Sequence, residues 1–276
     1  MRETKLKWLK IIVAVVLSAC LCLLLHYVRR VFVADTFVAR GHSMEPTFYD
    51  GEKVWVNKLK MGARIYTDFD FSSHHLSSFR MPGFSGLERG DLVVANYPYP
   101  DSKDTISFQI NYVYLKRCYG VPGDTLRIIN GYYRNSSSSE AIGNMEAQRQ
   151  LSLLSEEELF SAGLFPRAFH QDKSLGWTIR DFGPLYIPGK GDVVEINAQN
   201  FRMWRKMIMF ETGFMPQLSD GGEVSLNGLP LSEYRFTSDW YFLGGDNVLN
   251  SRDSRYIGLF PESYIVGTVE EKCRRI

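Results

Sequence analysis

One long apolar segment near the N-terminus constrains this chain more than any other feature. It runs from Trp8 to Val28 and is almost wholly apolar, with Lys10 and His26 near its ends. As a helix it would rise roughly 31 Å, which matches the hydrocarbon core of a bilayer at about 30 Å. We therefore predict a transmembrane helix. No later window holds the roughly eighteen apolar residues that a second span would need, so we predict a single pass.

The charges that flank this segment predict its orientation. The basic residues before or at its start are Arg2, Lys5, Lys7 and Lys10, and those after it are Arg29 and Arg30. This excess favours a cytoplasmic N-terminus. The alternative is a cleavable signal peptide, because Leu17–Cys20 fits a lipoprotein cleavage box. We prefer the anchor, since Cys20 is followed by more apolar residues, which would make an unsuitable start for a mature lipoprotein.

Composition favours a β-rich domain without a metal site. The chain has 276 residues, 14% of them aromatic, and short apolar runs alternate with Gly, Pro, Asn and Asp. A net charge of +1 gives no support to nucleic-acid binding. Cys118 and Cys273 are interpreted as free, largely buried thiols, and no Cys/His spacing indicates zinc. We expect no cofactor, no metal and no nucleic-acid partner.

Four similar segments predict strands that each follow a turn. Each has a glycine, then an acidic residue, then an alternating aliphatic run; they span residues 89–94, 122–128, 190–196 and 221–226. Two of them continue into Asn130-Gly131 and Asn227-Gly228, which predict tight hairpins.

Other segments give coarser predictions. Residues 60–88 are polar and rich in Ser and Phe, and predict a long loop, while residues 135–139 predict a linker. Residues 152–162 predict a helix, with Ser155 and Glu158 as a capping box. Residues 201–210 mix large apolar with basic side chains. We interpret them as a short helix packed on the sheet, and the alternative is a surface element that dips into the lipid interface.

Ser43 is the candidate nucleophile. Phe37-Val38-Ala39 predicts an extended strand, Gly41 permits a tight turn, and Pro46 restricts the chain after the serine. Such a turn exposes the hydroxyl and leaves the Ser43 backbone N–H available to an oxyanion.

A serine hydroxyl needs a base, and Lys116 is the better candidate. His26 lies in the anchor, and His42 is expected to point away from its neighbour Ser43. The remaining histidines, His74, His75 and His170, lie outside any motif, so a histidine triad stays open only as the weaker alternative. Lys116 lies in a predicted strand over 112–119, where period two places it on one face with Tyr112, Tyr114 and Cys118 and places Arg117 on the other. Desolvation on such a face would lower the lysine pKa from about 10.4, as a neutral amine base requires.

Three sequence blocks carry a family resemblance. They are Ser43-Met44-Glu45-Pro46-Thr47, then Lys116-Arg117-Cys118-Tyr119-Gly120-Val121-Pro122-Gly123-Asp124, and then Gly245-Asp246-Asn247 with Asn250-Ser251-Arg252-Asp253-Ser254-Arg255. Occurring in this order behind a membrane anchor, they resemble the bacterial type I signal peptidases, which use a Ser-Lys dyad. The resemblance covers about residues 8–60, 89–128 and 236–270.

The resemblance implies roles for individual residues. Ser43 and Lys116 would form the dyad, and Ser251 would orient the lysine amine. Phe37 and Ala39 would line pockets for small substrate side chains. The residues matching structural ion pairs are Asp246, Asp253 and Arg255.

The chain departs from the family pattern in two places. Gly41 stands where some members have an oxyanion-binding serine, so a second donor would be water or the Gly41 backbone. Val248 and Leu249 stand where many members have polar residues.

Together these patterns predict a mostly β protein in which one transmembrane helix precedes a signal-peptidase-like catalytic domain. Its predicted parts are a tail and anchor (1–30), a first part of the catalytic core (31–128), an inserted mixed cap subdomain (129–235) and a second part of the core (236–276). The expected function is removal of signal peptides from exported preproteins by a serine endopeptidase of the bacterial plasma membrane, with its catalytic domain on the outer face. Its expected partners are signal peptides and membrane lipid.

Two other functions were weighed. A non-enzymatic anchored β module is disfavoured because Ser43, Lys116 and Ser251 are all present. A self-cleaving Ser-Lys repressor would begin with a DNA-binding domain, where the apolar segment stands instead.

Overall fold

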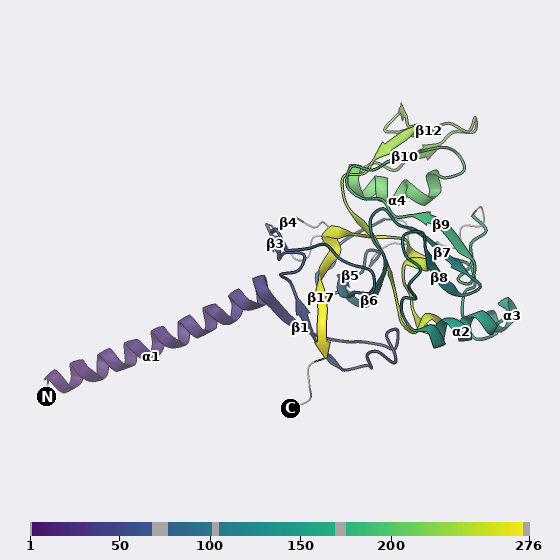
Figure 1. The fold of residues 1–276 in the computed structure, drawn as a ribbon. Helices are drawn as coiled ribbons and strands as arrows, with labels where there is room; N and C mark the ends of the chain where they lie inside the picture. Colours follow the sequence, from purple (N-terminus) through teal and green to yellow (C-terminus); the bar gives the residue numbers. More distant parts are fainter. Residues whose placement is uncertain (1, 68–76, 101–104, 169–174, 273–276) are drawn as a thin grey trace.

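The computed structural model describes residues 2–67, 77–100, 105–168 and 175–272. Helix α1 (Arg2–Val28) extends away from a β-rich body (Figure 1), and its described side chains are exposed. A short π-helix, η1 (Arg29–Val33), continues it into the first strand. The stretch Leu6–Val33 is long and apolar enough to cross a membrane, and it is the one such helix in the described part of the chain. The predicted single apolar N-terminal helix is therefore confirmed.

A seven-stranded antiparallel sheet forms the centre of the body. Its strands, in spatial order, are β1 (Ala34–Val38), β2 (Lys53–Asn57), β17 (Ile265–Lys272), β5 (Leu92–Asn96), β6 (Val113–Gly120), β15 (Trp240–Gly244) and β16 (Phe260–Pro261). Short helical turns lie between the last strands of the chain: η3 (Val248–Asn250), α5 (Ser254–Ile257) and η4 (Glu262–Tyr264). Because β17 lies between β2 and β5, and β15 pairs with β6, the two ends of the sequence share one sheet. The mostly β prediction is confirmed.

The predicted turn-and-strand segments are present. Strands β5, β7 (Thr125–Ile129), β10 (Val193–Glu195) and β12 (Val224–Leu226) each begin directly after a Gly-acid pair. Asn130-Gly131 joins β7 to β8 (Tyr132–Asn135), and Asn227-Gly228 joins β12 to β13 (Leu229–Pro230). Both residues of each pair have positive φ, 48° and 82° in the first and 49° and 80° in the second. Type I′ turns need this conformation, which Asn and Gly tolerate best, so both predicted hairpins are confirmed.

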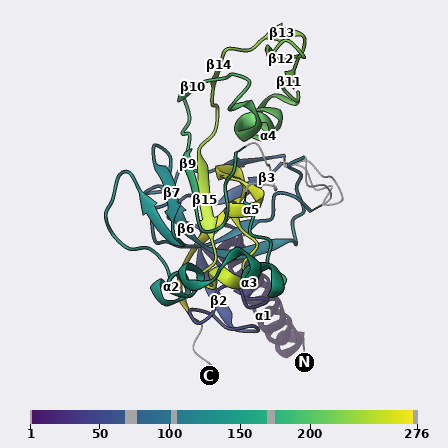
Figure 2. The same ribbon diagram turned by 90° about the vertical axis from the view of Figure 1, so that its right-hand side faces the viewer.

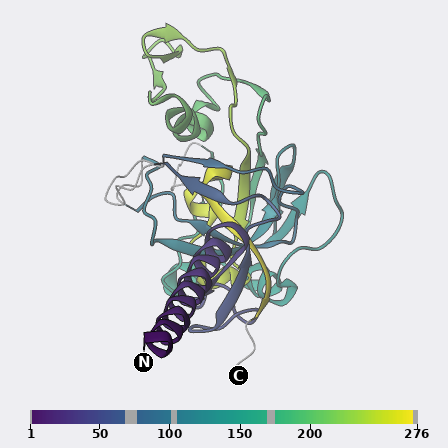
Figure 3. The same ribbon diagram turned by 90° about the vertical axis from the view of Figure 1, so that its left-hand side faces the viewer.

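The middle of the chain builds two groups of elements, and the helices of the two groups lie at opposite ends of the body (Figure 2). One group contains α2 (Met145–Leu153), α3 (Glu156–Ser161) and a sheet in which β7 lies between β8 and β9 (Phe182–Tyr186). The other group contains α4 (Phe201–Thr212), β10 paired with β14 (Glu233–Arg235), and β11 (Gln217–Leu218) paired with β12. In the view from the α1 side, α4 and its strands lie at the far end of the body from α1 (Figure 3).

One hydrophobic cluster joins both groups to the central sheet. It contains the buried side chains of Leu151 and Leu159 from the first group, Ile208 from the second, and Tyr119 and Phe242 from β6 and β15. The middle section therefore packs against the central sheet through a continuous apolar core.

Residues 60–88 are not a plain loop, so that prediction was wrong for the described part. β3 (Arg64–Tyr66) pairs with β4 (Ser78–Arg80), while residues 68–76 lie outside the described residues. Arg64 is buried and donates to Asn96 Oδ1 on β5 at 2.7 Å, and Arg80 donates to the Ile265 carbonyl at 2.6 Å. These long-range partners order the hairpin, and local composition does not reveal them.

Residues 135–139 are not a linker. The Asn135 amide donates to Asp124 Oδ2 at 2.6 Å, and Ser136 Oγ accepts the Thr125 backbone N–H at 3.0 Å. A bridge between Asn135 and Ser138 closes the turn. The serines thus satisfy backbone groups at the start of β7, a role that composition alone does not distinguish from a flexible tract.

The predicted capping box is confirmed, and the predicted start of its helix was wrong. Ser155 Oγ accepts the Glu158 N–H, and the Glu158 carboxylate accepts the Ser155 N–H. This box begins α3 at Glu156. The residues before it belong to the separate helix α2, which Asn144 caps.

Helix α4 packs inside the protein, so the preferred interpretation of residues 201–210 is confirmed. Trp204 and Ile208 are 4% and 0% exposed. The alternative, a segment that inserts these side chains into lipid, was wrong, because both already lie in the hydrophobic cluster.

Candidate active site

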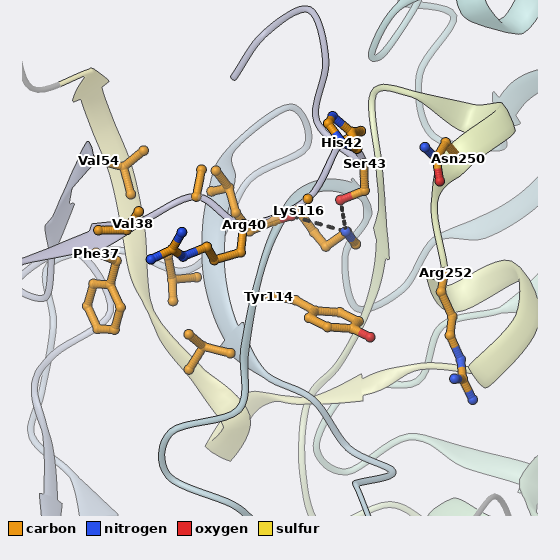
Figure 4. A pocket seen from close by; sticks show the side chains of 15 residues that line it. Phe37, Val38, Arg40, His42, Ser43, Val54, Tyr114, Lys116, Asn250 and Arg252 are labelled. Atoms are coloured by element: carbon orange, nitrogen blue, oxygen red, sulfur yellow. Dashed lines mark hydrogen bonds between the residues drawn. The ribbon is translucent and has the colours of Figure 1, made fainter. Parts of the chain in front are cut away.

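Ser43 and Lys116 form a hydrogen-bonded pair. Lys116 Nζ donates to Ser43 Oγ at 2.6 Å and to the Leu115 carbonyl at 3.2 Å (Figure 4). Lys116 lies on β6, whereas Ser43 lies in the loop between β1 and β2. The structure therefore brings the predicted nucleophile and base within reach of a direct proton transfer.

Burial favours the neutral form of the Lys116 amine. Its side chain is 3% exposed, and this desolvation lowers its pKa from 10.5 to about 8. The Asp253 carboxylate opposes the shift and the Arg255 guanidinium adds to it. The ammonium group also lies 4.9 Å from the centre of the Tyr114 ring. A pKa near 8 leaves an appreciable fraction of neutral amine at physiological pH.

The loop that carries Ser43 is held from several sides. Buried Met44 and Phe48 anchor it in a hydrophobic cluster with β2. The Asn247 N–H donates to the Ser43 carbonyl, and the Asn247 side-chain amide donates to the His42 carbonyl, both at 3.0 Å. These contacts fix the backbone that positions the Ser43 hydroxyl. Sequence reasoning assigned no role to Asn247, although it lies within the third block.

The two candidate oxyanion donors differ in availability. Within the described residues, the Ser43 backbone N–H makes no hydrogen bond, so it is available to a substrate oxygen. The Gly41 N–H donates to Asp50 Oδ1 at 2.8 Å. The suggestion that this N–H could be the second donor was therefore wrong, because an aspartate already occupies it.

Ser251 lies next to the serine loop. A Cβ atom on Gly245 would overlap both the Ser251 hydroxyl and the Ser43 carbonyl oxygen, so only glycine permits this close approach. Ser251 is 7% exposed; its hydroxyl makes no hydrogen bond of good geometry among the described residues, but it lies close enough to Asp253 to help lower the pKa of that carboxyl. The Lys116 amine bonds to Ser43 and Leu115 instead. The lysine-orienting role of Ser251 remains a prediction.

Asp253 and Arg255 form an ion pair beneath the site. Both are fully buried, and the guanidinium meets the two carboxylate oxygens at 2.8 and 2.9 Å. Burial alone would raise the pKa of Asp253, but the Arg255 charge holds it below its ordinary value. Asp253 also accepts the Gly245 N–H at 3.1 Å, which ties the ion pair to the loop beside Ser43.

Asp246 joins three segments of the site. Its two oxygens accept from the Arg117 guanidinium at 2.6 and 2.7 Å, and the Thr47 hydroxyl donates to it at 2.5 Å. Arg117 comes from the β6 strand and Thr47 from the serine loop. The carboxylate therefore fixes the Ser43 loop to the strand that carries Lys116. Sequence analysis placed Arg117 opposite Lys116 but did not identify Asp246 as its partner.

An open groove of about 240 Å³ passes over the Ser43–Lys116 pair (Figure 4). The residues that line it are Phe37, Val38, Ala39, Arg40, Gly41, His42, Ser43, Val54, Val94, Val113, Tyr114, Leu115, Lys116, Asn250 and Arg252. The predicted pocket residues Phe37 and Ala39 are among them. β1 forms one wall and β6 another, so the groove lies between two strands that are not neighbours in the sheet.

Histidine does not replace lysine in the described part of this site. His42 Nδ1 lies 2.8 Å from Glu45 Oε1, and this partner raises the His42 pKa. His26 belongs to α1, and the other three histidines lie outside the described residues. Within the described ranges, no cluster of three or more His, Cys, Asp or Glu side chains could hold a metal ion.

Comparison with known protein families gives a match to the one described as "Signal peptidase, peptidase S26", over residues 6–171 and 182–273. The chain belongs to this signal peptidase family. The match includes most of the middle section, which the three sequence blocks leave unplaced. The resemblance stated from those blocks is thereby confirmed.

Curated relatives agree with the family assignment. Signal peptidase I T of Bacillus subtilis (strain 168) is 27% identical over 269 residues, covering 96% of this chain and 83% of the relative. Signal peptidase I of Bacillus amyloliquefaciens is 26% identical over 258 residues, covering 92% and 79%. Signal peptidase I of Buchnera aphidicola subsp. Baizongia pistaciae is 25% identical over 252 residues, covering 90% and 72%. The similarity to these signal peptidases thus extends along most of the chain.

Proposed function

We propose that this signal peptidase removes N-terminal signal peptides from exported preproteins, with Ser43 as nucleophile and Lys116 as general base. The observation that carries the proposal is the 2.6 Å hydrogen bond from the Lys116 amine, which is buried with a pKa near 8, to the Ser43 hydroxyl. A base must lie within hydrogen-bond reach of the proton it removes and must be deprotonated at working pH.

The chemistry follows from this pair. Neutral Lys116 takes the Ser43 hydroxyl proton as Oγ attacks the scissile carbonyl carbon, and the Ser43 N–H stabilises the resulting oxyanion. When the C–N bond breaks, the Lys116 ammonium returns a proton to the leaving amine. Water then attacks the acyl ester on Ser43, again with Lys116 as the base, and releases the cleaved signal peptide with a free carboxyl end.

The groove suits an extended peptide. β1 is the edge strand of the central sheet and has β2 as its partner there, so its other edge can receive a substrate strand. Alternate substrate side chains would then enter the groove beside Phe37 and Ala39. We propose that small residues are required one and three positions before the scissile bond, in keeping with the family resemblance. Larger side chains would clash there.

Membrane attachment places the site near its substrates. We propose that α1 crosses the membrane with its N-terminus in the cytoplasm, as the preceding basic residues favour. From Val28, the chain reaches Ser43 within at most about 50 Å even when fully extended. The catalytic domain would therefore work on the outer face, close to lipid and to the membrane-embedded part of a preprotein.

Cleavage of a model preprotein by purified variants tests the mechanism. Ser43→Ala and Lys116→Ala should each abolish processing, because neither the nucleophile nor the neutral amine can be replaced by a neighbour. Ser43→Cys should retain part of the activity, since a thiol can still be activated. The matched control is Lys190→Ala, an exposed lysine outside the groove, which should cleave like the wild type.

Circular dichroism should show that each variant keeps the wild-type β content. Substantial turnover by purified Ser43→Ala or Lys116→Ala would refute the Ser-Lys mechanism. If the wild type bound signal peptides but never cleaved them, the result would favour a non-enzymatic binding module.

A further inference from the structure

Two arginines lie on opposite sides of the Ser43–Lys116 pair. Arg40 lies two residues after the end of β1, and Arg252 follows Ser251; both line the groove and both are exposed. In Figure 4 the Arg40 side chain extends toward Phe37 and Val38, whereas Arg252 lies on the other side of the pair. A peptide that passes over Ser43 would therefore have one guanidinium beside each half.

Neither guanidinium is neutralised by a described residue. Among the described residues, no acidic side chain lines the groove, and none forms an ion pair or a hydrogen bond with either guanidinium. The three acids of the serine loop already have partners, because Asp50 accepts the Gly41 N–H, Glu45 pairs with His42, and Glu52 accepts the Tyr49 N–H.

Asp253, the residue after Arg252, is bound to Arg255 in the interior. The groove therefore carries a positive charge that its own walls do not balance.

The Arg252 guanidinium is also held in place. Its Cζ atom lies 5.5 Å from the centre of the Tyr97 ring, a cation–π contact with a buried tyrosine. An arginine side chain that is already fixed loses less entropy when a ligand binds. At the rim of a concave surface its charge also attracts an anion more strongly than it would on a flat surface. Such a charge favours an anionic group in the peptide that fills the groove.

We propose that Arg40 and Arg252 select signal peptides that carry an acidic residue close to the cleavage site. This inference rests on the proposed function, and it adds a substrate class to it. Phe37 and Ala39 face the small side chains one and three positions before the scissile bond. Strand alternation then places Arg40 beside the residue two positions before it. Arg252, across the catalytic pair, faces the first residues after the bond.

Peptide binding by the full-length Ser43→Ala protein in non-ionic detergent tests the proposal without depending on catalysis. The parent peptide has Ala at both small positions, Ser two before the bond and Gln two after it. Asp at the first of these positions, or Glu at the second, should tighten binding roughly five-fold, as expected for one partly exposed charge pair. Lys at either position should weaken it, and added salt should reduce both effects.

Second-site variants assign each preference to one arginine. Arg40→Gln should remove only the preference for Asp before the bond, and Arg252→Gln only that for Glu after it. Arg40→Glu should reverse the first preference in favour of Lys. The matched control is Arg127→Gln, an exposed arginine on β7 outside the groove, which should keep both preferences.

Two outcomes would overturn the proposal. Equal binding of acidic and parent peptides would show that the arginines are merely solvated. If Arg40→Gln and Arg252→Gln instead reduced binding to phosphatidylglycerol vesicles while peptide preferences persisted, the two charges would serve lipid headgroups. A wild type that binds acidic peptides preferentially but cleaves none would refute the proposed function while leaving this selectivity established.

Discussion

At the scale of single residues, the proposed mechanism depends on the desolvated amine of Lys116, and burying this amine lowers the stability of the folded state. A lysine serves as a base only when it is neutral, and burial lowers its pKa to about 8. When Lys116 is neutral, its amine can accept the Ser43 hydroxyl proton instead of donating a proton to the Ser43 oxygen. The pH dependence of cleavage should therefore follow the titration of this one group.

We expect kcat/KM to rise with pH and level off above about 8. Below that value the neutral fraction of Lys116 grows about ten-fold per pH unit, and above it the amine is already deprotonated. The measurement is initial-rate cleavage of a soluble peptide between pH 6 and 10, with stability checked at each pH. A rate that stays flat from pH 6 to 9, with chemistry limiting, would exclude a lysine base.

Lys116→Met should be inactive yet more stable than the wild type at pH 7. Below pH 8 the folded state carries the full cost of a buried charge; the shift from 10.5 to about 8 corresponds to about 3 kcal/mol. That cost fades as pH rises from 8 toward 10.5, where the amine is neutral in both states. Losing the Ser43 hydrogen bond offsets about 1 kcal/mol. We therefore expect a gain of about 2 kcal/mol.

Unfolding by denaturant in detergent, at pH 7 and pH 10, measures this gain. The gain should shrink or disappear at pH 10. Ser43→Ala is the control, because it removes the same hydrogen bond and keeps the buried amine. A gain of equal size at both pH values would mean that better packing, rather than charge burial, explains it.

At the scale of elements, the site depends on segments that clamp one another. The serine loop is closed at its base by Ala39, whose N–H donates to the Glu52 carbonyl and whose own carbonyl accepts the Gly51 N–H. Asp246 then ties the same loop to Arg117 on β6. These contacts join elements that are far apart in sequence and hold the site locally. We therefore expect a substitution in a distant packing element to disturb the site only if it unfolds the whole body.

Trp204→Ser on α4 tests this expectation. The Trp204 ring is buried and meets the Phe236 ring at 5.8 Å, so we expect a loss of about 3–5 kcal/mol. Arg202→Gln, on the exposed face of the same helix, should change stability by less than about 0.5 kcal/mol. Chemical denaturation of both variants measures the difference. A near-neutral Trp204→Ser with weakened vesicle binding would restore the lipid-insertion interpretation of this helix.

At the scale of the whole molecule, anchor and body are separable. The described side chains of α1 are exposed, and the three hydrophobic clusters consist entirely of residues from Ala34 onward. We propose that 129–235 is an insertion between two parts of the catalytic core. Since its side chains share one cluster with Tyr119 and Phe242, we expect it to contribute to the folding of the body rather than to form an independent unit.

Residues 29–276 should therefore fold and cleave soluble peptides without the anchor. Ser43, Lys116 and Ser251 all lie in this part, and removal of α1 uncovers no core residue. Far-UV circular dichroism and peptide cleavage measure the outcome, with the full chain as control. Processing of membrane-inserted preproteins should fall, because the site is no longer held near the bilayer. A truncated chain that lacks β structure would show that the anchor supports the fold.

Local signals in the sequence determined much of this protein. The apolar run predicted α1, Asn-Gly pairs predicted two hairpins, and Ser155 with Glu158 predicted a helix start. Each depends on neighbouring residues alone, through periodicity, φ preference or a side-chain cap. The sequence blocks likewise identified the family, because their residues keep their order and spacing.

Only the tertiary structure decided the rest, because those features depend on residues that meet across the sheet. The strand order from β1 to β6 brings Lys116 to Ser43, and the pairing of β6 with β15 brings Arg117 to Asp246. Long-range partners also order Arg64 in a segment that resembled a loop. Tertiary packing likewise buried Trp204, and it gave the Gly41 N–H to Asp50. The charge left uncompensated at Arg40 and Arg252 is also such a feature, since it depends on which side chains the fold places around the groove.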